Sequence, residues 1–434
     1  MRRLYPTREY HSPLGATTKI KMTKKLITAL LILLVYSNVN CQTSANINWE
    51  YNFGEEKNDG VNSIIKTQDG GFVVVGYSTD SSFNVNLCLI KLDENGNEEW
   101  KKFFGDDNEL EMGIDLVQLN NSDFLVLGNC SSKIAKGKEI WLLHLNNEGE
   151  LIQEKKFGKN ADDIASQIIT CNNSGFAILA TSNSEITDNC SFWLFKINDS
   201  LELEWESFFG GDEFEAKYYQ TVGGEKVRFV SREEAFALAQ SKDNGFLLGG
   251  YQSDSQNVTN NWVIKTDSLG QEIWNKCYGT FGGDFVNGIY DLHPKVVAVG
   301  IRYDKKDDFN YMMDFAIIDK NEVVETTYNA EDYETVETSC QTEDSGFLLV
   351  GFKGENLSFA ELEDREPKRD AWLVKVDSEG KKLWEFTIKE KGINLLKSVI
   401  EIEKNVFILA GGKRDESTQL QDLWITKISI KNKE

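Results

Sequence analysis

The strongest constraint on this chain is an apolar segment that recurs seven times along it. It reads GGFVVVG from residue 70, SDFLVLG from 122, SGFAILA from 174 and NGFLLGG from 244, and then KVVAVG from 295, SGFLLVG from 345 and NVFILAG from 405. Counted from Phe72 to Phe407, the copies are 52, 52, 70, 50, 51 and 60 residues apart. A period near fifty residues predicts an array of similar units that bury their faces against one another.

Each unit contains four short segments that are typical of β-strands. In the first unit they cover residues 61–68, 72–78, 87–93 and 98–104. β-Branched and aromatic residues dominate these segments, and Gly, Asn and Asp separate them, which indicates antiparallel hairpins. Four strands per unit at this period predict an all-β fold, a seven-bladed β-propeller.

The two ends of the repeat region indicate how the ring closes. The segment INWEYNFG (47–54) matches a fourth strand, and LWITKISI (423–430) matches a third strand with no fourth strand after it. We therefore expect the N-terminal strand to complete the last blade, which removes an open sheet edge. One domain, residues 42–434, is expected, with a hairpin insertion at about 213–234.

Residues 1–41 have the pattern of an N-terminal extension followed by a signal peptide. Two lysines precede the apolar run 26–35, and Met22 stands where such a peptide would start. The run is too short to span a bilayer, and no later run is long enough. We expect a secreted protein, or a periplasmic or outer-membrane-associated one, cleaved after Cys41; a lipid attached to Cys41 is the alternative.

Composition narrows the classes of partner and of chemistry. The chain has 47 basic and 70 acidic residues and a formal net charge of −23, which argues against nucleic acid as a partner. After residue 41 there are six scattered cysteines, expected to be packed thiols, and two histidines, His144 and His293. These are too few for a metal centre. We therefore expect no metal, no cofactor and no catalytic residue, and a monomer.

A second repeated motif has the spacing D-x-x-G-x-x-x-W. It occurs as Asp93, Gly96 and Trp100, as Asp267, Gly270 and Trp274, and as Asp377, Gly380 and Trp384. We expect Asp and Gly to form a tight turn and the indole to pack between sheets. Trp49 and Trp205 hold the same fourth-strand position, where Gln153 and Val324 are exceptions. Five units have a tryptophan in the third strand, and in the first and fifth units we expect Cys88 and Phe315 to take its place. The five tryptophans are Trp141, Trp193, Trp262, Trp372 and Trp424.

This motif resembles the tryptophan-docking repeat of quinoprotein-like (PQQ-type) β-propellers. With the glycine-ended strands it is similar to the repeats of secreted bacterial propeller proteins, over about residues 45–430. The resemblance implies the propeller architecture. Because some members of the family depend on a quinone, a quinone-dependent dehydrogenase activity also stays a possible function of this chain.

Variable connections show where a ligand site is expected. Links from strand four to the next strand one, and from strand two to strand three, emerge on one face of a propeller and carry the length variation here. The longest insertion contains KYYQTVGGEKVRFV (217–230), in which Gly223-Gly224 predicts a two-residue hairpin turn. That pairing directs Tyr219, Lys226 and Arg228 outwards, with Arg232 close by. The alternative is a loop that only covers the channel mouth.

The function expected from these features is a binding or interaction scaffold outside the cytoplasm. Its partner would be a glycan, an anionic small molecule or a protein. The alternative is an extracytoplasmic enzyme with a carboxylate or quinone-dependent site at the propeller mouth. Acidic stretches after the fourth strands, such as GDDNELE (105–111), lack the ligand spacing of an EF-hand and are expected to be solvated turns.

Overall fold

The computed structural model describes residues 43–432 apart from fifteen short gaps. The gaps are 55–56, 107–109, 132–136, 160, 184–189, 211–217, 221–225, 229–231, 254–257, 281, 305–309, 329–332, 355–368, 390–393 and 415–419. The expected signal peptide and its expected cleavage site lie outside the described residues. All regular secondary structure in the described residues is β, and they contain no helix that could cross a membrane.

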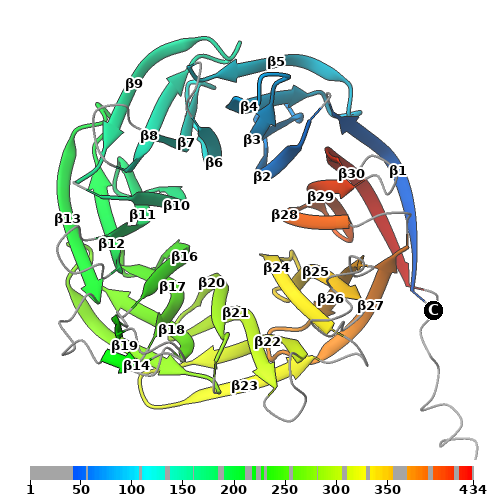
Figure 1. Ribbon diagram of the computed structural model, residues 1–434. Coiled ribbons are helices and arrows are strands. Elements are labelled where there is room, and N and C mark those ends of the chain that lie inside the picture. The colour runs from blue at the N-terminus through cyan, green and yellow to red at the C-terminus, as the bar shows by residue number, and fades with distance from the viewer. Residues whose placement is uncertain are drawn as a thin grey trace, which may run out of the picture. The chain divides into compact units, whose positions relative to one another are not determined.

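Seven four-stranded antiparallel sheets form a ring, with each first strand at the centre and each fourth strand at the rim (Figure 1). Blades 1 to 3 are β2 (Asp59–Lys66), β3 (Phe72–Thr79), β4 (Val85–Leu92), β5 (Glu98–Phe104); β6 (Glu111–Gln118), β7 (Phe124–Ser131), β8 (Lys138–Leu145), β9 (Leu151–Phe157); and β10 (Asp163–Thr170), β11 (Phe176–Asn183), β12 (Cys190–Ile197), β13 (Leu203–Gly210). The expected all-β, seven-bladed propeller is confirmed.

Blades 4 to 7 complete the ring with the same strand order. They are β16 (Glu233–Gln240), β17 (Phe246–Ser253), β18 (Thr259–Thr266), β19 (Glu272–Tyr278); β20 (Phe285–Leu292), β21 (Lys295–Asp304), β22 (Asn310–Ile318), β23 (Val323–Tyr328); β24 (Tyr333–Gln341), β25 (Phe347–Gly354), β26 (Arg369–Val376), β27 (Lys382–Ile388); and β28 (Asn394–Glu403), β29 (Val406–Arg414), β30 (Gln421–Asn432), β1 (Thr43–Phe53). A separate two-stranded sheet, β14 (Tyr218–Gln220) with β15 (Lys226–Arg228), precedes blade 4.

The N-terminal strand completes the last blade. β1 pairs with β30, so the sheet order of blade 7 is β1-β30-β29-β28. The indole of Trp424 donates to Glu50 Oε1 at 3.1 Å, and the Thr426 hydroxyl donates to the Trp49 carbonyl at 3.1 Å. Residues of blade 7 and of blade 1 share one apolar cluster, as Leu423 and Val61 illustrate. The expected closure therefore joins the two ends of the repeat region.

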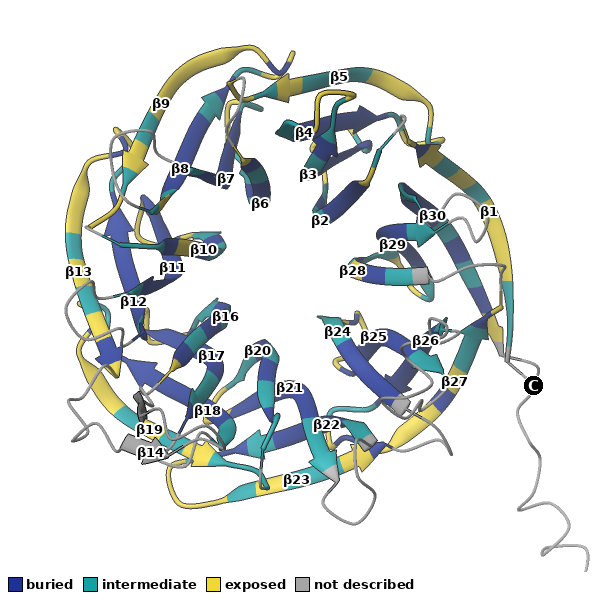
Figure 2. Cartoon of the chain, viewed as in Figure 1, coloured by how far each residue is buried: buried dark blue, intermediate teal, exposed yellow. Residues whose placement is uncertain are grey.

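The core lies between adjacent blades. Strands two and three of each blade are buried on both faces, whereas the fourth strands expose their outer side (Figure 2). Each apolar cluster spans two neighbours; for example, Leu127 of blade 2 packs with Ile178 and Trp193 of blade 3. Because both faces of the middle strands are covered, their sequences are continuous apolar runs rather than alternating ones.

The Asp–Gly turns join strands three and four and also contact the previous blade. Asp93 Oδ1 accepts the backbone N–H groups of Asn95 and Asn97, both at 2.8 Å, and Gly96 has a φ of 83°. A Cβ atom on Gly96 would lie 2.6 Å from the indole of Trp49 in the neighbouring blade. Gly270 faces Trp205 in the same way. Glycine therefore permits both the positive φ and the close approach of the tryptophan.

Candidate functional site

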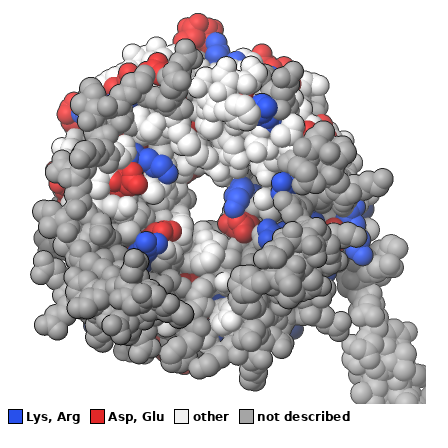
Figure 3. All heavy atoms as spheres, in the orientation of Figure 1, with Lys and Arg blue, Asp and Glu red and all other residues white. Residues whose placement is uncertain are grey.

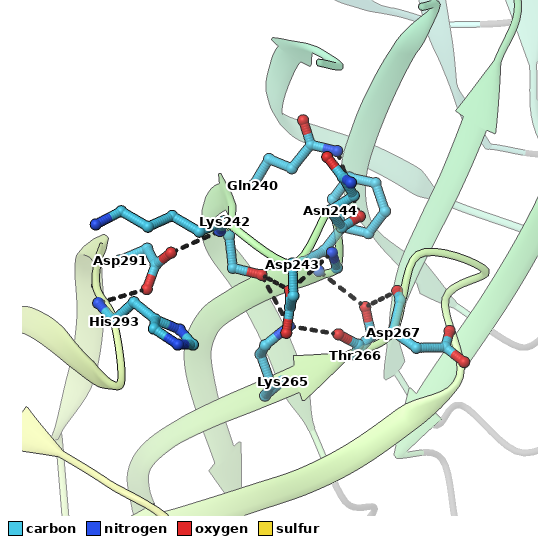
Figure 4. Close-up of polar contacts among 12 residues, drawn as sticks. Gln240, Lys242, Asp243, Asn244, Lys265, Thr266, Asp267, Asp291 and His293 are labelled. Atoms are coloured by element: carbon cyan, nitrogen blue, oxygen red, sulfur yellow. Dashed lines mark hydrogen bonds and ion pairs between the residues drawn. The ribbon is translucent and has the colours of Figure 1, made fainter. Parts of the chain in front are cut away.

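Four blades contain a repeated ion pair between the third strand and the first turn. The third-strand lysine of blade 4, Lys265, contacts Asp243 of the first turn at 2.8 Å (Figure 4). Lys91 with Asp69 and Lys375 with Asp344 repeat this pair at 3.0 and 2.9 Å. In blade 2 the partners are His144 and Asp123, whose Nε2 and Oδ2 atoms are 3.0 Å apart. His144 thus takes part in the repeated structure.

Two of these first-turn carboxylates, Asp243 and Asp344, are held ionised. Although burial raises the pKa of Asp243, hydrogen bonds from Lys265 and Ser241 outweigh it and lower that pKa to about 2. The pKa of Asp344 is likewise lowered to about 2, because hydrogen bonds from Thr342 and Lys375 outweigh the effect of burial. The ion pairs therefore persist across the neutral range and support the fold.

A second repeated carboxylate lies at the start of the first strands, and sequence reasoning missed it. Asp284 accepts the backbone N–H of Thr280 at 2.5 Å and that of Tyr303 at 2.7 Å. Asp163 accepts the N–H of Lys159 at 2.6 Å. The equivalent residues are also buried: Asp59, Glu111, Glu233 and Glu334. Each lies at or next to the first residue of a first strand, so an acidic residue at that place was the available signal. Glu111 corrects the expectation that the whole 105–111 stretch is solvated.

The predicted insertion contains a hairpin, but its register differs from the expected one. Tyr218 opposes Arg228 and Tyr219 opposes Val227, so the expected pairing of Tyr219 with Arg228 is wrong by one residue. The side chains of Tyr219, Lys226 and Arg228 lie outside the described residues. Arg232 is exposed, and its backbone pairs with Ser253 at the end of β17.

The same sector holds the largest departure from the repeat. Asp314 pairs with Thr327 as Trp372 pairs with Thr387, so Asp314, and not Phe315, occupies the tryptophan position of blade 5. Phe315 belongs to the opposite face of β22 and contacts Phe347 of blade 6, with ring centroids 5.4 Å apart. The assignment of Phe315 was wrong because a one-residue shift along a strand exchanges its two faces.

Asp314 lies in a buried polar cluster between blades 4 and 5. Asn261 Nδ2 is 3.4 Å from Asp314 Oδ2, and Arg302 pairs with Glu325 at 2.9 Å. Burial raises the pKa of Asp314 to about 8, and the neighbouring charge of Glu325 adds to the effect, while Arg302 opposes it. Elsewhere the residue at the position of Glu325 accepts an indole N–H, as Glu206 does from Trp193 at 3.0 Å.

The first strands surround the centre of the ring, and a β-bulge interrupts each of them at the same place. Side chains after the bulge bridge to the next blade. Asp115 Oδ2 accepts the N–H of Ile168 at 3.1 Å, and Gln167 Oε1 accepts that of Leu238 at 2.7 Å. Burial raises the pKa of Asp115 to about 6 against the hydrogen bond from Ser63. The polar side chains of blades 1 to 3 thus form a belt along the inner wall.

The belt changes character at blade 4. Phe236 is the bulge residue of β16, and Ala237 stands where Asp115 and Gln167 provide acceptors. The half-buried ring of Phe236 lies 5.7 Å from that of Phe285 and 6.0 Å from that of Tyr251. In the space-filling view the ring is hollowed at its centre, with acidic and basic side chains beside the hollow (Figure 3). The blade 4–5 sector therefore adds an aromatic surface to a polar wall.

The described residues provide little for metal or thiol chemistry. They contain no cluster of three or more His, Cys, Asp or Glu side chains arranged to hold a metal ion. Of the six described cysteines, Cys277 is exposed and four others are buried. Burial raises the pKa of Cys130 and of Cys171 to about 11, so neither thiol is activated. The arrangement is one that can bind through aromatic faces and hydrogen bonds.

Comparisons with known proteins find structural similarity at low sequence identity. No protein-family model and no curated protein sequence matches this chain. A protein of unknown function from Dyadobacter fermentans is similar at 13% identity, covering 89% of this chain and 99% of that one, with a TM-score of 0.45. The β-propeller domain of the Trilobed protease from Pyrococcus furiosus is similar at 11% identity, covering 85% of this chain and 96% of that one, with a TM-score of 0.48. The polysaccharide lyase Uly1 is similar at 8% identity, covering 85% of this chain and 89% of that one, with a TM-score of 0.47. At these TM-scores the neighbours do not indicate a function.

Proposed function

We propose that this propeller is a binding scaffold that takes a glycan with acidic groups over blades 4 and 5. The observation that carries the proposal is the aromatic group of Phe236, Tyr251 and Phe285, at the place where the polar belt is interrupted. Half-buried rings on a rigid frame provide large contact area at low entropic cost, and adjacent polar groups provide orientation.

Charges of both signs lie beside this surface, because Glu234 and Arg232 act in opposite directions on the pKa of Tyr251, which burial raises most. Arg232, exposed directly before β16, is the residue that would contact an acidic group of the ligand. The sequence of the insertion ahead of it also contains Lys226, Arg228 and Tyr219, whose side chains lie outside the described residues. These basic residues stand out in a chain with a net charge of −23. Variable connections on a rigid scaffold are where binding residues are generally found. We place the protein outside the cytoplasm on the N-terminal sequence pattern.

The test is binding of acidic and neutral oligosaccharides on an array, followed by titration calorimetry. We expect Phe236→Ala with Arg232→Ala to weaken binding of an acidic oligosaccharide at least about tenfold, which corresponds to about 1.4 kcal/mol. Phe103→Ala, which removes an aromatic side chain exposed on β5 of blade 1, is the matched control and should leave affinity unchanged.

Two results would contradict the proposal. If the double variant binds every array ligand as the wild type does, the site is not over blades 4 and 5. If incubation with an oligosaccharide yields shortened products, the protein is an enzyme, and the alternative of a carboxylate site at the propeller mouth replaces the binding scaffold.

A further inference from the structure

Two buried side chains face each other across the boundary between blades 4 and 5. Asn261 of β18 and Asp314 of β22 are 0% and 1% exposed, and Asn261 Nδ2 is 3.4 Å from Asp314 Oδ2. The amide oxygen of Asn261, Oδ1, and the second carboxyl oxygen of Asp314, Oδ1, are both buried and have no hydrogen-bond partner among the described residues. Two acceptor oxygens therefore lack a donor in the same small region.

An ionised Asp314 cannot satisfy this arrangement. A carboxylate only accepts hydrogen bonds, and a primary amide offers donors on its nitrogen alone, so an ionised Asp314 provides no donor for the amide oxygen of Asn261. A carboxylic acid can donate through its own O–H group. One proton on Asp314 Oδ1 would be donated to Asn261 Oδ1, while Asn261 Nδ2–H is donated to Asp314 Oδ2. All four polar atoms then have partners.

The surrounding charges favour the same protonation state. Glu325 of β23 and Asp284 before β20 both disfavour a second negative charge at Asp314, and burial has the largest effect, raising its pKa to about 8. Arg302 of β21, which is paired with Glu325, and a hydrogen bond from the backbone N–H of Phe315 oppose this and are outweighed. Tyr278 of β19 and Tyr328 of β23 are the other titratable neighbours, and burial raises the pKa of each further above its usual value.

A bound cation does not fit these residues as well. Asp284 already accepts two backbone N–H groups, from Thr280 and Tyr303, and Glu325 is engaged by Arg302. Asp314 Oδ1 and Asn261 Oδ1 are the two oxygens of this pair that are buried without a partner among the described residues, and two ligands are few for such a cation. Calcium takes about six to eight oxygen ligands and magnesium about six. The described residues also contain no metal-binding cluster of carboxylates here.

We propose that Asp314 carries a proton at neutral pH and forms a cyclic carboxylic acid–amide pair with Asn261, fastening blade 5 to blade 4 until the proton is lost. When the proton leaves, the second hydrogen bond breaks and a carboxylate faces Glu325 and Asp284. The boundary that holds the Phe236 aromatic surface on its inner side is therefore weakened in alkaline solution. This device does not depend on the identity of any ligand.

The expected pH dependence follows from linkage. An unfolded Asp has a pKa of about 3.9, so between that value and about 8 the folded chain binds a proton that the unfolded chain does not. Stability conferred by this group is therefore greatest in acid, falls as the pH rises across this window, and is constant above it. The unfolding equilibrium constant should rise by up to about tenfold per pH unit from this group alone.

The test is infrared spectroscopy of the full chain, because a protonated carboxyl and a carboxylate absorb at different frequencies. We expect the wild type at pH 7 to show a protonated-carboxyl band that Asp314→Asn lacks and that disappears with a midpoint near pH 8. Asp314→Asn is isosteric and can form an amide–amide pair, so it should fold. Asp319→Asn, in the outer turn of the same blade, is the control and should keep the band.

The partner is tested separately. Asn261→Leu should leave the Asp314 O–H without an acceptor and move the carboxyl band to higher frequency. If Asn261→Leu does not fold, the wild-type and Asp314→Asn difference spectrum alone decides the protonation state. A wild type without a protonated-carboxyl band at pH 7, or a band that Asn261→Leu leaves in place, would overturn the proposal. Neither result bears on whether the protein binds a glycan.

Discussion

Blades 5 and 6 are neighbours with the same strand order and different interiors. Blade 6 has the fully buried Trp372 and the ion pair of Lys375 with Asp344. Blade 5 has Asp314 in place of that tryptophan and Ile317 in place of that lysine, since Ile317 opposes Val324 as Lys375 opposes Trp384. The same backbone therefore accommodates an indole or a carboxyl at one site, provided that the facing residue changes too.

The difference teaches which feature each blade depends on. In blade 6 the indole of Trp372 fills the space between sheets, and Lys375 is paired with Asp344 at the first turn. In blade 5 the pairing of Arg302 with Glu325 and the contact of Asp314 with Asn261 form the polar interior. Buried polar groups are tolerated when they are paired and are costly otherwise. The strand register is kept in both, because apolar alternation and turns specify it.

The largest effect on the free energy of unfolding should come from placing an aspartate, the residue of blade 5, at the tryptophan position of blade 6. Trp372→Asp removes a buried aromatic side chain, which costs about 3–5 kcal/mol, and adds a carboxyl without a prepared partner. We expect a loss of at least about 4 kcal/mol in the free energy of unfolding, measured by urea denaturation. A loss below about 1 kcal/mol would mean that blade boundaries accept either residue without a matching partner.

An intermediate effect is expected from the ion pair that blade 5 lacks. Because Asp344 has a pKa of about 2 when folded and about 3.9 when unfolded, its contribution is present above pH 4 and is lost as the pH falls through 2. Asp344 is partly exposed, so we expect Asp344→Asn to cost about 1–2 kcal/mol at pH 7. This difference from the wild type should disappear near pH 2 in acid unfolding. Asp243→Asn in blade 4 should show the same profile; a constant difference at all pH values would contradict the argument.

The smallest effect concerns the indole nitrogens. Trp193 donates to Glu206, whereas Trp372 Nε1 is buried without an acceptor among the described residues. Replacing each with Phe removes similar apolar area, but only Trp193→Phe breaks a hydrogen bond. We expect Trp193→Phe to be about 1 kcal/mol more destabilising than Trp372→Phe in thermal unfolding. The reverse order would show that the environment of Trp372 depends on its N–H.

The candidate site was less predictable than the fold. The insertion before blade 4 was identified from its length and its Gly223-Gly224 pair, yet its pairing register was missed by one residue. The exchange of tryptophan for Asp314 was readable in principle, since Asp314 precedes Asp319 by the same five residues that separate Trp372 from Asp377. It was missed because Phe315, the next residue, is aromatic and was assigned to the tryptophan position instead. No sequence pattern indicated the aromatic group around Phe236, because its members come from three strands of two blades.

The sequence by itself determined the number of blades, the four strands of each and the closure by the N-terminal strand. These depend on local patterns, which are apolar runs, turn residues and a period near fifty, and every copy repeats the same information. Only the tertiary structure decided that Asp314 meets Asn261 and that Asp284 holds the chain that links blade 4 to blade 5. The physical reason is that a contact between blades depends on which face of a strand each side chain occupies. A shift of one residue reverses that face.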